Sequence, residues 1–365
     1  MKTWLKTLFT GMIAATFLSG CGGNDSSTNS IQVDQKEYRW KLVTSWPKNF
    51  PGLGTAPENF AKLVNEMSNG RLKVRVYGAG EIVPGFEVFD AVSQGTAQMG
   101  HAASYYWKGK MAAAPIFTAI PFGLNAQETN AWIHYGGGLE LWRELYKPFG
   151  VIPFAGGNTG VQSSGWFKKE INSVDDLKGL KMRIPGLGGE VMQKLGAVPV
   201  ALTGGELFTS LQSGAIDATE WVGPYNDLAF GFYKVAQHYY ASGWHEPGAM
   251  LEFTVNEAAF NSLPSDLQKI VEVATRAINQ DMFDEYTARN NAALETLKTK
   301  HGVAVKTFPE SVFKALKMAS AEVVTEQIAA DKMFEKVMRS YSQFQKQVSE
   351  YHKISEEEYY KNRSN

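Results

Sequence analysis

The residues best suited to binding chemistry are charged and amide side chains set in apolar or glycine-rich stretches. Arg183 stands near the end of the string LKMRI, just before Pro185 and Gly186. Ligands of open α/β sheets bind beyond the carboxyl ends of strands, and an arginine there can bind a carboxylate through two parallel hydrogen bonds. A surface arginine paired with a nearby acid is the alternative that this pattern leaves open.

Two glutamates and one glutamine provide oxygen atoms that could hold a cation. Glu220 lies in the string ATEWVGP and Glu246 in GWHEP, so both carboxylates have bulky neighbours. A buried carboxylate needs a cation or several hydrogen-bond donors. Together with Gln162 they would suit a hard cation that takes oxygen ligands, although spacing alone does not bring the three together.

The sequence carries none of the common nucleophile or phosphate-binding motifs GxSxG, HExxH and GxxxxGK[ST]. The glycine-rich residues 136–138 and 186–189 lack the features of a dinucleotide site and are interpreted as turns. The histidines have no ligand-like spacing and are expected on the surface or in the core: His101, His134, His238, His245, His301 and His352. These observations disfavour an enzyme.

The elements that must position these residues follow an α/β pattern. Residues 39–45 and 72–77 are predicted strands, and the helix between them begins at Thr55 and Glu58, which have capping-box spacing, and stops at Gly70. A strand, a helix and a strand in that order predict a parallel or mixed sheet. The alternation recurs as a strand at 180–184 and short helices at 190–195 and 206–212.

The C-terminal part is predicted to be mostly helical from Pro264 onward, with one strand within residues 302–308. Its last helix places apolar and aromatic residues at steps of three and four: Phe334, Val337, Tyr341, Phe344, Val348 and Tyr351. A narrow seam of this period packs against another helix. The helix therefore either lies on its own subunit or forms a subunit interface.

Charge and cysteine content restrict the classes of partner. The chain of 365 residues has 36 Lys plus Arg against 37 Asp plus Glu, which gives a net charge of −1. Its length allows two domains, and its charge excludes a basic surface for nucleic acid. One cysteine, Cys21, cannot form an internal disulfide or a cysteine-based zinc cluster.

The N-terminus has the layout of a secretory signal. Residues 1–20 combine two lysines, an apolar stretch and small residues, and are too short to span a membrane stably. The string LSGC resembles the lipobox of bacterial lipoproteins, so Cys21 is the expected lipidation site, and residues 21–37 form a flexible tether. An ordinary cleavable signal that happens to contain a cysteine is the alternative. Either interpretation predicts a protein outside the cytoplasm, and the first predicts a lipid anchor in the periplasm.

Long strings of the sequence resemble the solute-binding proteins of TRAP transporters, from about Arg39 to near Tyr351. Within that group they resemble the subfamily that binds 2-oxo and 2-hydroxy monocarboxylates, such as pyruvate and lactate, with a metal cation. The strings are RWKLVTSWP, GEIVPGFEVFDAV, YYWKGK, GNTGVQ, LKGLKMRIPGLGGEV, LQSGAIDATEWVGPYND and GWHEPG.

The resemblance implies an α/β fold of two lobes, a clamp like the type II periplasmic binding proteins, with mixed sheets and long C-terminal helices. Lobe I would comprise residues 38–157 and 249–292, and lobe II residues 158–248 and 293–330. Residues 331–360 would form a dimerisation helix exchanged between subunits, so a homodimer is expected.

The resemblance also implies roles for individual residues. Arg183 would bind the substrate carboxylate, with hydrogen bonds from Asn158 and Tyr106. Phe122, Trp221 and Trp46 would enclose the apolar end of the ligand. A cation, Na⁺ or Ca²⁺, would be held by Gln162, Glu220, Glu246 and the backbone carbonyl of Trp221, and it would reverse the field of the two carboxylates.

The implied function is capture of a small monocarboxylate without chemical conversion. The closed form would be presented to the membrane permease of a TRAP transporter. A lipid-anchored sensor that presents the ligand to a receptor is the alternative, and a metal-dependent enzyme is a more remote one.

Overall fold

The computed structural model describes residues 36–363. The expected signal peptide, the lipidation site Cys21 and nearly all of the expected tether lie outside the described residues. From Glu37 onward the described residues form one compact unit, and the description below concerns this unit.

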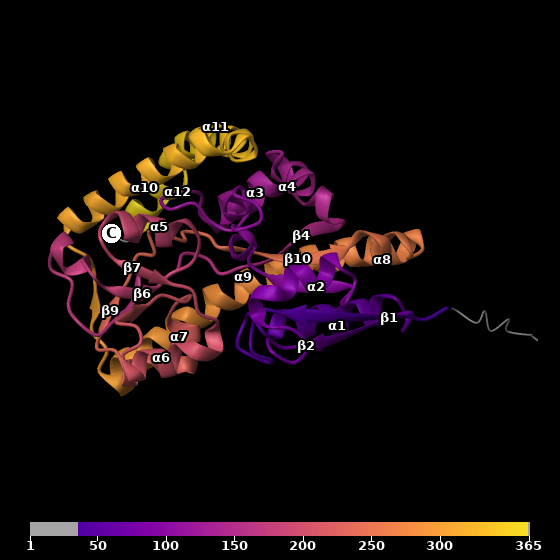
Figure 1. Cartoon of the computed structure of the whole chain (residues 1–365), viewed down its shortest axis with the longest axis horizontal. Helices are drawn as coiled ribbons and strands as arrows, with labels where there is room; N and C mark the ends of the chain where they lie inside the picture. The colour runs from indigo at the N-terminus through magenta and orange to yellow at the C-terminus, as the bar shows by residue number, and fades with distance from the viewer. Residues whose placement is uncertain (1–35, 364–365) are drawn as a thin grey trace, which may run out of the picture. The chain divides into compact units, whose positions relative to one another are not determined.

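Two mixed sheets organise the described chain (Figure 1). The first sheet has the strand order β2 (Leu72–Tyr77), β1 (Tyr38–Thr44), β3 (Met99–Ala102), β10 (Met250–Asn256) and β4 (Val151–Asn158). The second sheet has the order β11 (Val305–Lys306), β9 (His238–Tyr240), β5 (Gly165–Phe167), β8 (Ala218–Thr219), β6 (Lys181–Arg183) and β7 (Val198–Val200). β1 pairs in parallel with β2 across the first helix, which confirms the predicted strand-helix-strand unit.

The helices cover these sheets and extend beyond them. The shorter ones are α1 (Thr55–Met67), α2 (Val88–Ser93), α3 (Ala126–Tyr135), α4 (Gly138–Tyr146), α5 (Gly186–Lys194), α6 (Leu207–Ser213), α7 (Pro224–Phe230), α8 (Glu257–Asn261) and α12 (Glu356–Arg363). The long ones are α9 (Ser265–His301), α10 (Glu310–Ala330) and α11 (Lys332–Ile354). None of the helices in residues 36–363 is both long and apolar enough to cross a membrane.

Three connections join the two sheets: β4 to β5, β9 to β10, and α9 to β11. The long helix α9 packs against β4 and α1 and, further along its length, against α7 (Figure 1). Each sheet has its own buried apolar residues, such as Leu42 and Phe253 in the first sheet and Phe167 and Tyr239 in the second. The predicted fold class, an α/β clamp of two lobes with mixed sheets and long C-terminal helices, is confirmed.

The capping box predicted at the start of α1 is wrong. Gly54 is the N-cap residue and no side chain caps the helix, while the Thr55 hydroxyl donates to the Gly52 carbonyl at 3.3 Å. The preceding turn already satisfies the first donors of the helix, because Thr55 N–H donates to the Phe50 carbonyl at 3.1 Å and Ala56 N–H donates to the Gly52 carbonyl at 3.0 Å. A side-chain cap is therefore not needed there.

The interpretation of residues 186–189 as a turn is also wrong. These residues form the first turn of α5, which therefore begins at Gly186, earlier than the predicted range 190–195. The helix starts directly after β6 and packs very close to it: a Cβ at Gly189 would lie 2.8 Å from the Ile184 carbonyl oxygen. Glycine permits this close approach at the cost of helix propensity, which misled the sequence analysis.

Candidate functional site

Arg183 and Glu220 meet because their strands are neighbours in the second sheet. β6 and β8 run in parallel, with Arg183 opposite Thr219, so the chain beyond β8 continues past the end of β6. The Glu220 N–H donates to the Arg183 carbonyl at 3.2 Å and fixes this register. Both side chains are buried, at the carboxyl ends of their strands.

The Arg183 guanidinium is held from several directions. It donates to the Glu220 carboxylate and, at 3.2 Å, to the Glu220 carbonyl, and its Nη2 lies 3.4 Å from the Tyr106 hydroxyl. The guanidinium carbon lies 4.9 Å from the Trp221 ring centroid. Burial alone would lower the pKa of Arg183, but the Glu220 carboxylate raises it above its ordinary value, so the guanidinium stays charged.

Gln162 and Glu246 are brought together by the loop that follows β9. The Gly243 N–H donates to the Gln162 carbonyl at 2.7 Å, and the Gln162 N–H donates to the Glu246 carbonyl at 3.2 Å. A Cβ at Gly243 would overlap the Gln162 backbone, so glycine is required at this crossing. The Gln162 amide Nε2 then donates to Glu246 Oε2 at 2.8 Å.

The donor set fits a hard cation. Glu220 and Glu246 offer carboxylate oxygens within 4.8 Å of each other, and Gln162 Oε1 is buried with no hydrogen-bond partner. Arg183 pairs with Glu220, whereas no lysine or arginine of the described residues forms an ion pair with Glu246. Burial, and then the charge of Glu220, raises the pKa of Glu246 well above its ordinary value. A bound cation would offset the repulsion between the two buried carboxylates.

Aromatic side chains surround these polar groups. Trp46 lies edge-on to Trp221 with ring centroids 6.0 Å apart, and it also contacts Tyr106. The Trp46 indole N–H donates to Nδ1 of the buried His101 at 2.8 Å, and His101 Nε2 lies 2.9 Å from the Gly156 carbonyl. Burial lowers the pKa of His101 to about 4, so a neutral imidazole fixes Trp46 in place.

A small cavity of about 10 Å³ lies among these residues. It is lined by Trp46, Leu53, Tyr105, Tyr106, Thr159, Gln162, Trp221, Val222, Glu246 and Leu251, which come from both sheets and their flanking segments. A cavity of this size can hold about one water molecule. The segments of the two sheets that line the cavity are thus packed against each other. A ligand of several atoms can reach the site only when these segments separate.

Four predicted site residues lie outside this cavity lining: Arg183, Glu220, Asn158 and Phe122. The Asn158 amide is buried and hydrogen-bonded within the chain, with Nδ2 donating to the Gly248 carbonyl at 3.3 Å and Oδ1 accepting from the Gly160 N–H at 2.9 Å. Phe122 packs against Trp244, with ring centroids 6.0 Å apart. Arg183 and Glu220 still join the lining residues Tyr106, Gln162, Trp221 and Glu246 through direct contacts, whereas the contacts given above for Asn158 and Phe122 are to other residues.

One residue of the group was missed by the sequence analysis. His245 is buried, and its Nε2 lies 3.3 Å from Glu220 Oε2. The expectation that the histidines lie on the surface or in the core does not account for this contact with a site carboxylate. The available signal was its position next to Glu246 in the string WHEP.

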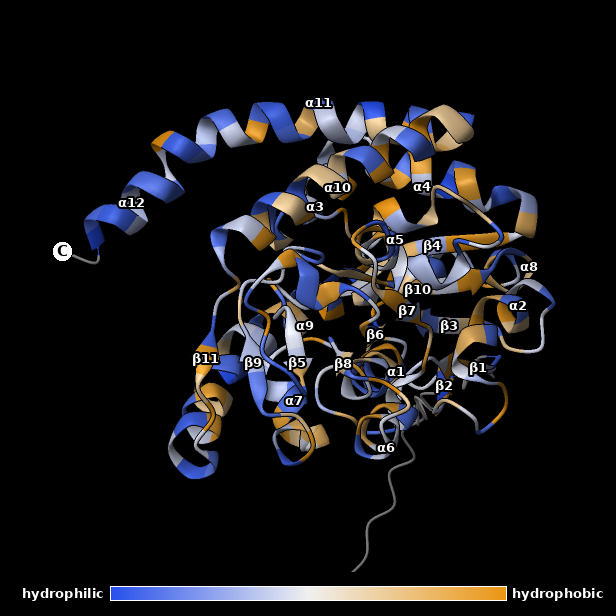
Figure 2. Ribbon diagram, turned by 60° about the vertical axis from the view of Figure 1, so that its left-hand side comes forward, coloured by the Kyte–Doolittle hydropathy of each residue, from blue (hydrophilic) through white to orange (hydrophobic). Residues whose placement is uncertain are grey.

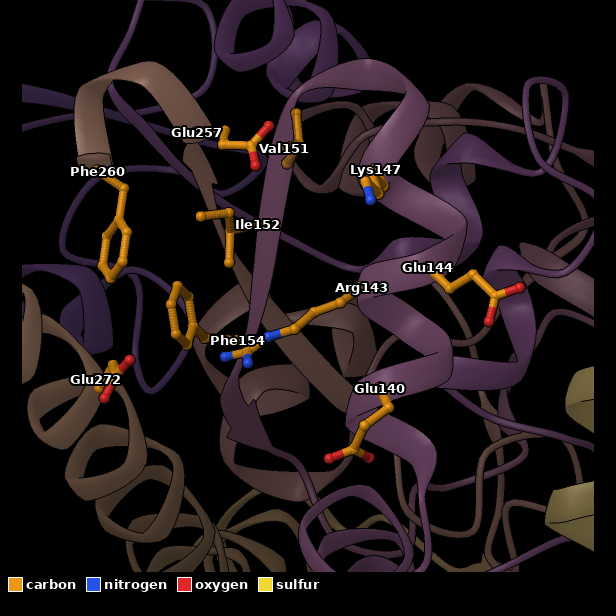
Figure 3. A pocket seen from close by; sticks show the side chains of 10 residues that line it. All are labelled: Glu140, Arg143, Glu144, Lys147, Val151, Ile152, Phe154, Glu257, Phe260 and Glu272. Atoms are coloured by element: carbon orange, nitrogen blue, oxygen red, sulfur yellow. The ribbon is translucent and has the colours of Figure 1, made fainter. Parts of the chain in front are cut away.

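A larger hollow lies elsewhere in the described chain. It has a volume of about 420 Å³ and lies between α4, β4, α8 and α9 (Figure 3). Arg143 reaches across it toward Phe154, with its guanidinium carbon 5.4 Å from the ring centroid. Apolar and oppositely charged side chains alternate along this open groove, and it lacks the buried, converging polar groups of the site described above.

Comparisons with known proteins identify the family. The sequence profile of the bacterial extracellular solute-binding proteins, family 7, matches residues 42–331. A monocarboxylate 2-oxoacid-binding periplasmic protein from Nostoc sp. (strain PCC 7120) is 44% identical over 346 residues, which is 95% of this chain and 94% of that protein.

Solved structures of TRAP periplasmic solute-binding proteins match almost the whole fold. The protein from Pseudoalteromonas atlantica, with bound sodium and pyruvate, has 47% identity and a TM-score of 0.87, covering 89% of this chain and 99% of that one. The protein from Colwellia psychrerythraea, with bound calcium and pyruvate, has 48% identity and a TM-score of 0.87, covering 90% and 100%. The resemblance to TRAP solute-binding proteins is confirmed. The chain belongs to the bacterial extracellular solute-binding proteins, family 7.

Proposed function

We propose that this protein binds small 2-oxo or 2-hydroxy monocarboxylates, pyruvate among them, together with Na⁺ or Ca²⁺. It acts as the extracytoplasmic solute-binding subunit of a TRAP transporter and releases its ligand unchanged. The relatives that bind pyruvate with sodium or calcium support this assignment, because they share close to half of the sequence.

The observation that carries the proposal is the charge balance of the site. Glu220 and Glu246 are buried near each other, and Arg183 pairs with only the first. A monocarboxylate alone would be repelled by the two glutamates. A cation together with one monocarboxylate adds no net negative charge, and both can bind at once.

In the proposed site Arg183 binds the ligand carboxylate, assisted by Tyr106 and Asn158. Trp221, Trp46 and Phe122 enclose the apolar end. Gln162, Glu220, Glu246 and the Trp221 carbonyl hold the cation, which supplies positive charge to the ligand oxygens. Asn158 and Tyr106 reach the ligand only if their hydrogen bonds within the chain rearrange when the lobes open and close.

The proposed lobes are the residue ranges expected from the sequence, 38–157 with 249–292 and 158–248 with 293–330. The site lies between the two sheets, so ligand binding favours the closed form by contacting both sides. A membrane permease would recognise that closed form. The protein would work in the periplasm, anchored by a lipid on Cys21.

A homodimer is proposed through the end of α11. The first half of this helix packs on its own chain, where Phe334, Val337 and Tyr341 are buried. Beyond that half, Tyr351 is 62% and Ile354 77% exposed, although His352 between them pairs with Glu128 of α3 at 2.6 Å, and Figure 2 shows α12 extending away from the sheets. A partner subunit would cover these apolar side chains.

A panel of small molecules matched to pyruvate tests the ligand class by isothermal titration calorimetry in buffer with calcium. Pyruvate and lactate should bind, because each has a carboxylate and an oxygen at C2. Propionate lacks the second oxygen and hydroxyacetone lacks the carboxylate, so both should bind far more weakly. Equal affinity for propionate and pyruvate would contradict the proposed contact between the cation and the C2 oxygen.

A further inference from the structure

Glu220 divides its two carboxylate oxygens between partners on different segments. Oε1 accepts from Arg183 on β6, and Oε2 lies 3.3 Å from Nε2 of His245, in the loop after β9. An ionised carboxylate only accepts hydrogen bonds, so the His245 ring must carry its hydrogen on Nε2. Nδ1 of the same ring is buried without a hydrogen-bond partner, so Nε2 is the ring nitrogen that makes the contact.

Packing fixes the position of the His245 ring. The side chain is 1% exposed, and a Cβ at Gly188 of α5 would lie 3.1 Å from the His245 Cβ. The neighbouring Trp244 stands edge-on to the ring, and its carbonyl accepts from the Phe122 N–H at 2.8 Å. The imidazole therefore reaches Glu220 from a loop that is itself held in place.

The divided contact has a consequence for the site. A guanidinium and a carboxylate prefer two parallel hydrogen bonds. If both oxygens of Glu220 turned to Arg183, the pair would occupy the guanidinium proposed for the ligand and the carboxylate proposed for the cation. An N–H donor on Oε2 opposes that rotation.

We infer that His245 is a positioning residue that holds Glu220 in the orientation needed for cation binding. The inference rests on the proposed function and adds to it a residue outside the expected cation ligands. Partners of this kind, which orient a metal ligand without binding the metal, typically contribute about 10- to 100-fold to metal affinity.

Calorimetric calcium titrations of the full chain, in sodium-free buffer, test this role with two substitutions. His245→Leu removes the donor and should lower calcium affinity by about 10- to 100-fold. His245→Gln has an amide N–H that can reach Oε2, so it should retain most of the wild-type affinity. The half-buried His238 of β9 provides the matched controls His238→Leu and His238→Gln, which should bind calcium like the wild type.

The outcomes separate this inference from the proposed function. Unchanged calcium affinity in His245→Leu would overturn the positioning role of His245. Equal losses of affinity in both His245 variants would also overturn it, provided that their near-ultraviolet circular dichroism shows native folding. The wild-type titration tests the proposed function, because failure to bind calcium even with pyruvate present would contradict that function directly.

Nitrogen-15 NMR of the imidazole in the wild-type protein gives an answer that does not depend on folding of the variants. The account predicts a His245 ring with a hydrogen on Nε2, both before and after calcium is added. A ring with its hydrogen on Nδ1, or loss of the Nε2 hydrogen on calcium addition, would overturn the positioning role. The second result would make His245 a direct ligand.

Discussion

At the residue scale, the proposed contact between Arg183 and the ligand carboxylate can be tested by a conservative substitution. Arg183→Lys keeps a positive charge but loses the planar pair of donors, so pyruvate affinity should fall by about 10- to 100-fold. Calorimetry measures this fall directly. Arg143→Lys is the control, because Arg143 lies in the open groove of Figure 3 and its substitution should leave affinity unchanged. Equal affinity of Arg183→Lys and wild type would rule out a bidentate contact.

Glu252 on β10 should make stability depend on pH. It is buried and accepts hydrogen bonds from Trp107 Nε1 at 2.5 Å and from the Tyr146 hydroxyl at 2.7 Å. Burial raises its pKa to about 7, above the ordinary 4.5, despite these donors. The folded protein thus binds this proton more tightly than the unfolded chain does. Its contribution is fully present below about pH 4.5 and is lost as the pH rises through about 7.

Urea unfolding of wild type and Glu252→Gln at pH 5 and pH 8 measures this contribution. Each pKa unit corresponds to about 1.4 kcal/mol, so the wild type should lose roughly 2 to 3 kcal/mol more than the variant between these pH values. Other buried acids, such as Asp227 with a pKa of about 8, contribute to both proteins and cancel in the comparison. Parallel pH profiles would show that Glu252 does not titrate in this range.

Individual site residues were predictable to different degrees. Arg183 and Glu220 follow strands, so their meeting at one sheet edge has a local explanation. Gln162 and Glu246 meet only because a loop crosses back over the segment after β4, and no spacing rule encodes that crossing. Their grouping came from resemblance to a family. His245 was missed because its partner, Glu220, lies 25 positions away in the sequence.

At the element scale, hydrophobic alternation predicted the strands well. The predicted strand at 72–77 matches β2. The strand-helix-strand unit was predictable because its apolar residues recur every two positions in the strands and every three to four positions in the helix. Element starts were less predictable. The start of α5 depends on how closely its glycines approach Ile184, and the start of α1 depends on the preceding turn, so neither is a local property of the sequence.

The ion pair between Lys108 and Glu190 links elements on opposite sides of the site. Lys108 lies two residues after Tyr106, in the segment that follows β3 of the first sheet. Glu190 lies on α5, beside the second sheet. Lys108→Met should weaken pyruvate affinity by about two- to fivefold, because a partly exposed pair that forms only on closure contributes up to about 1 kcal/mol. The charge swap Lys108→Glu with Glu190→Lys should restore the affinity.

The matched control is the ion pair of Lys194 with Glu326, at 2.7 Å between α5 and α10. This pair does not connect the two sheets. Lys194→Met should therefore leave pyruvate affinity unchanged, as calorimetry would show. A loss in Lys194→Met equal to that in Lys108→Met would mean that the pair with Glu190 stabilises α5 rather than closure.

At the scale of the whole molecule, the apolar end of α11 should control the oligomeric state. Sedimentation velocity should show a dimer for the wild type and a monomer for the double variant Tyr351→Asp, Ile354→Asp, because buried charge disfavours an apolar interface. Met318→Asp is the control, since Met318 is a similarly exposed apolar residue, 58%, on α10. A wild-type monomer, or a dimer that survives the double substitution, would contradict the proposed interface.

The closed arrangement of the two sides could not be predicted from the sequence alone. It depends on contacts between distant aromatic residues, such as Trp46 with Trp221 and Phe50 with Phe230. Each pair joins two segments that are far apart in the sequence, and the spacing of apolar residues within one segment does not show which other segment it contacts. The same closure reduces the site to a cavity of about 10 Å³, so opening and binding must be coupled.

The central claim is that ligand and cation bind together, and calorimetric titration of pyruvate at several cation concentrations tests it most directly. The protein is first dialysed against chelator in sodium-free buffer, and calcium or sodium is then added in steps. Binding of two ligands to one site is reciprocally linked, so pyruvate affinity should rise by about 5- to 150-fold as the cation saturates. The same pyruvate affinity with and without both cations would contradict the account.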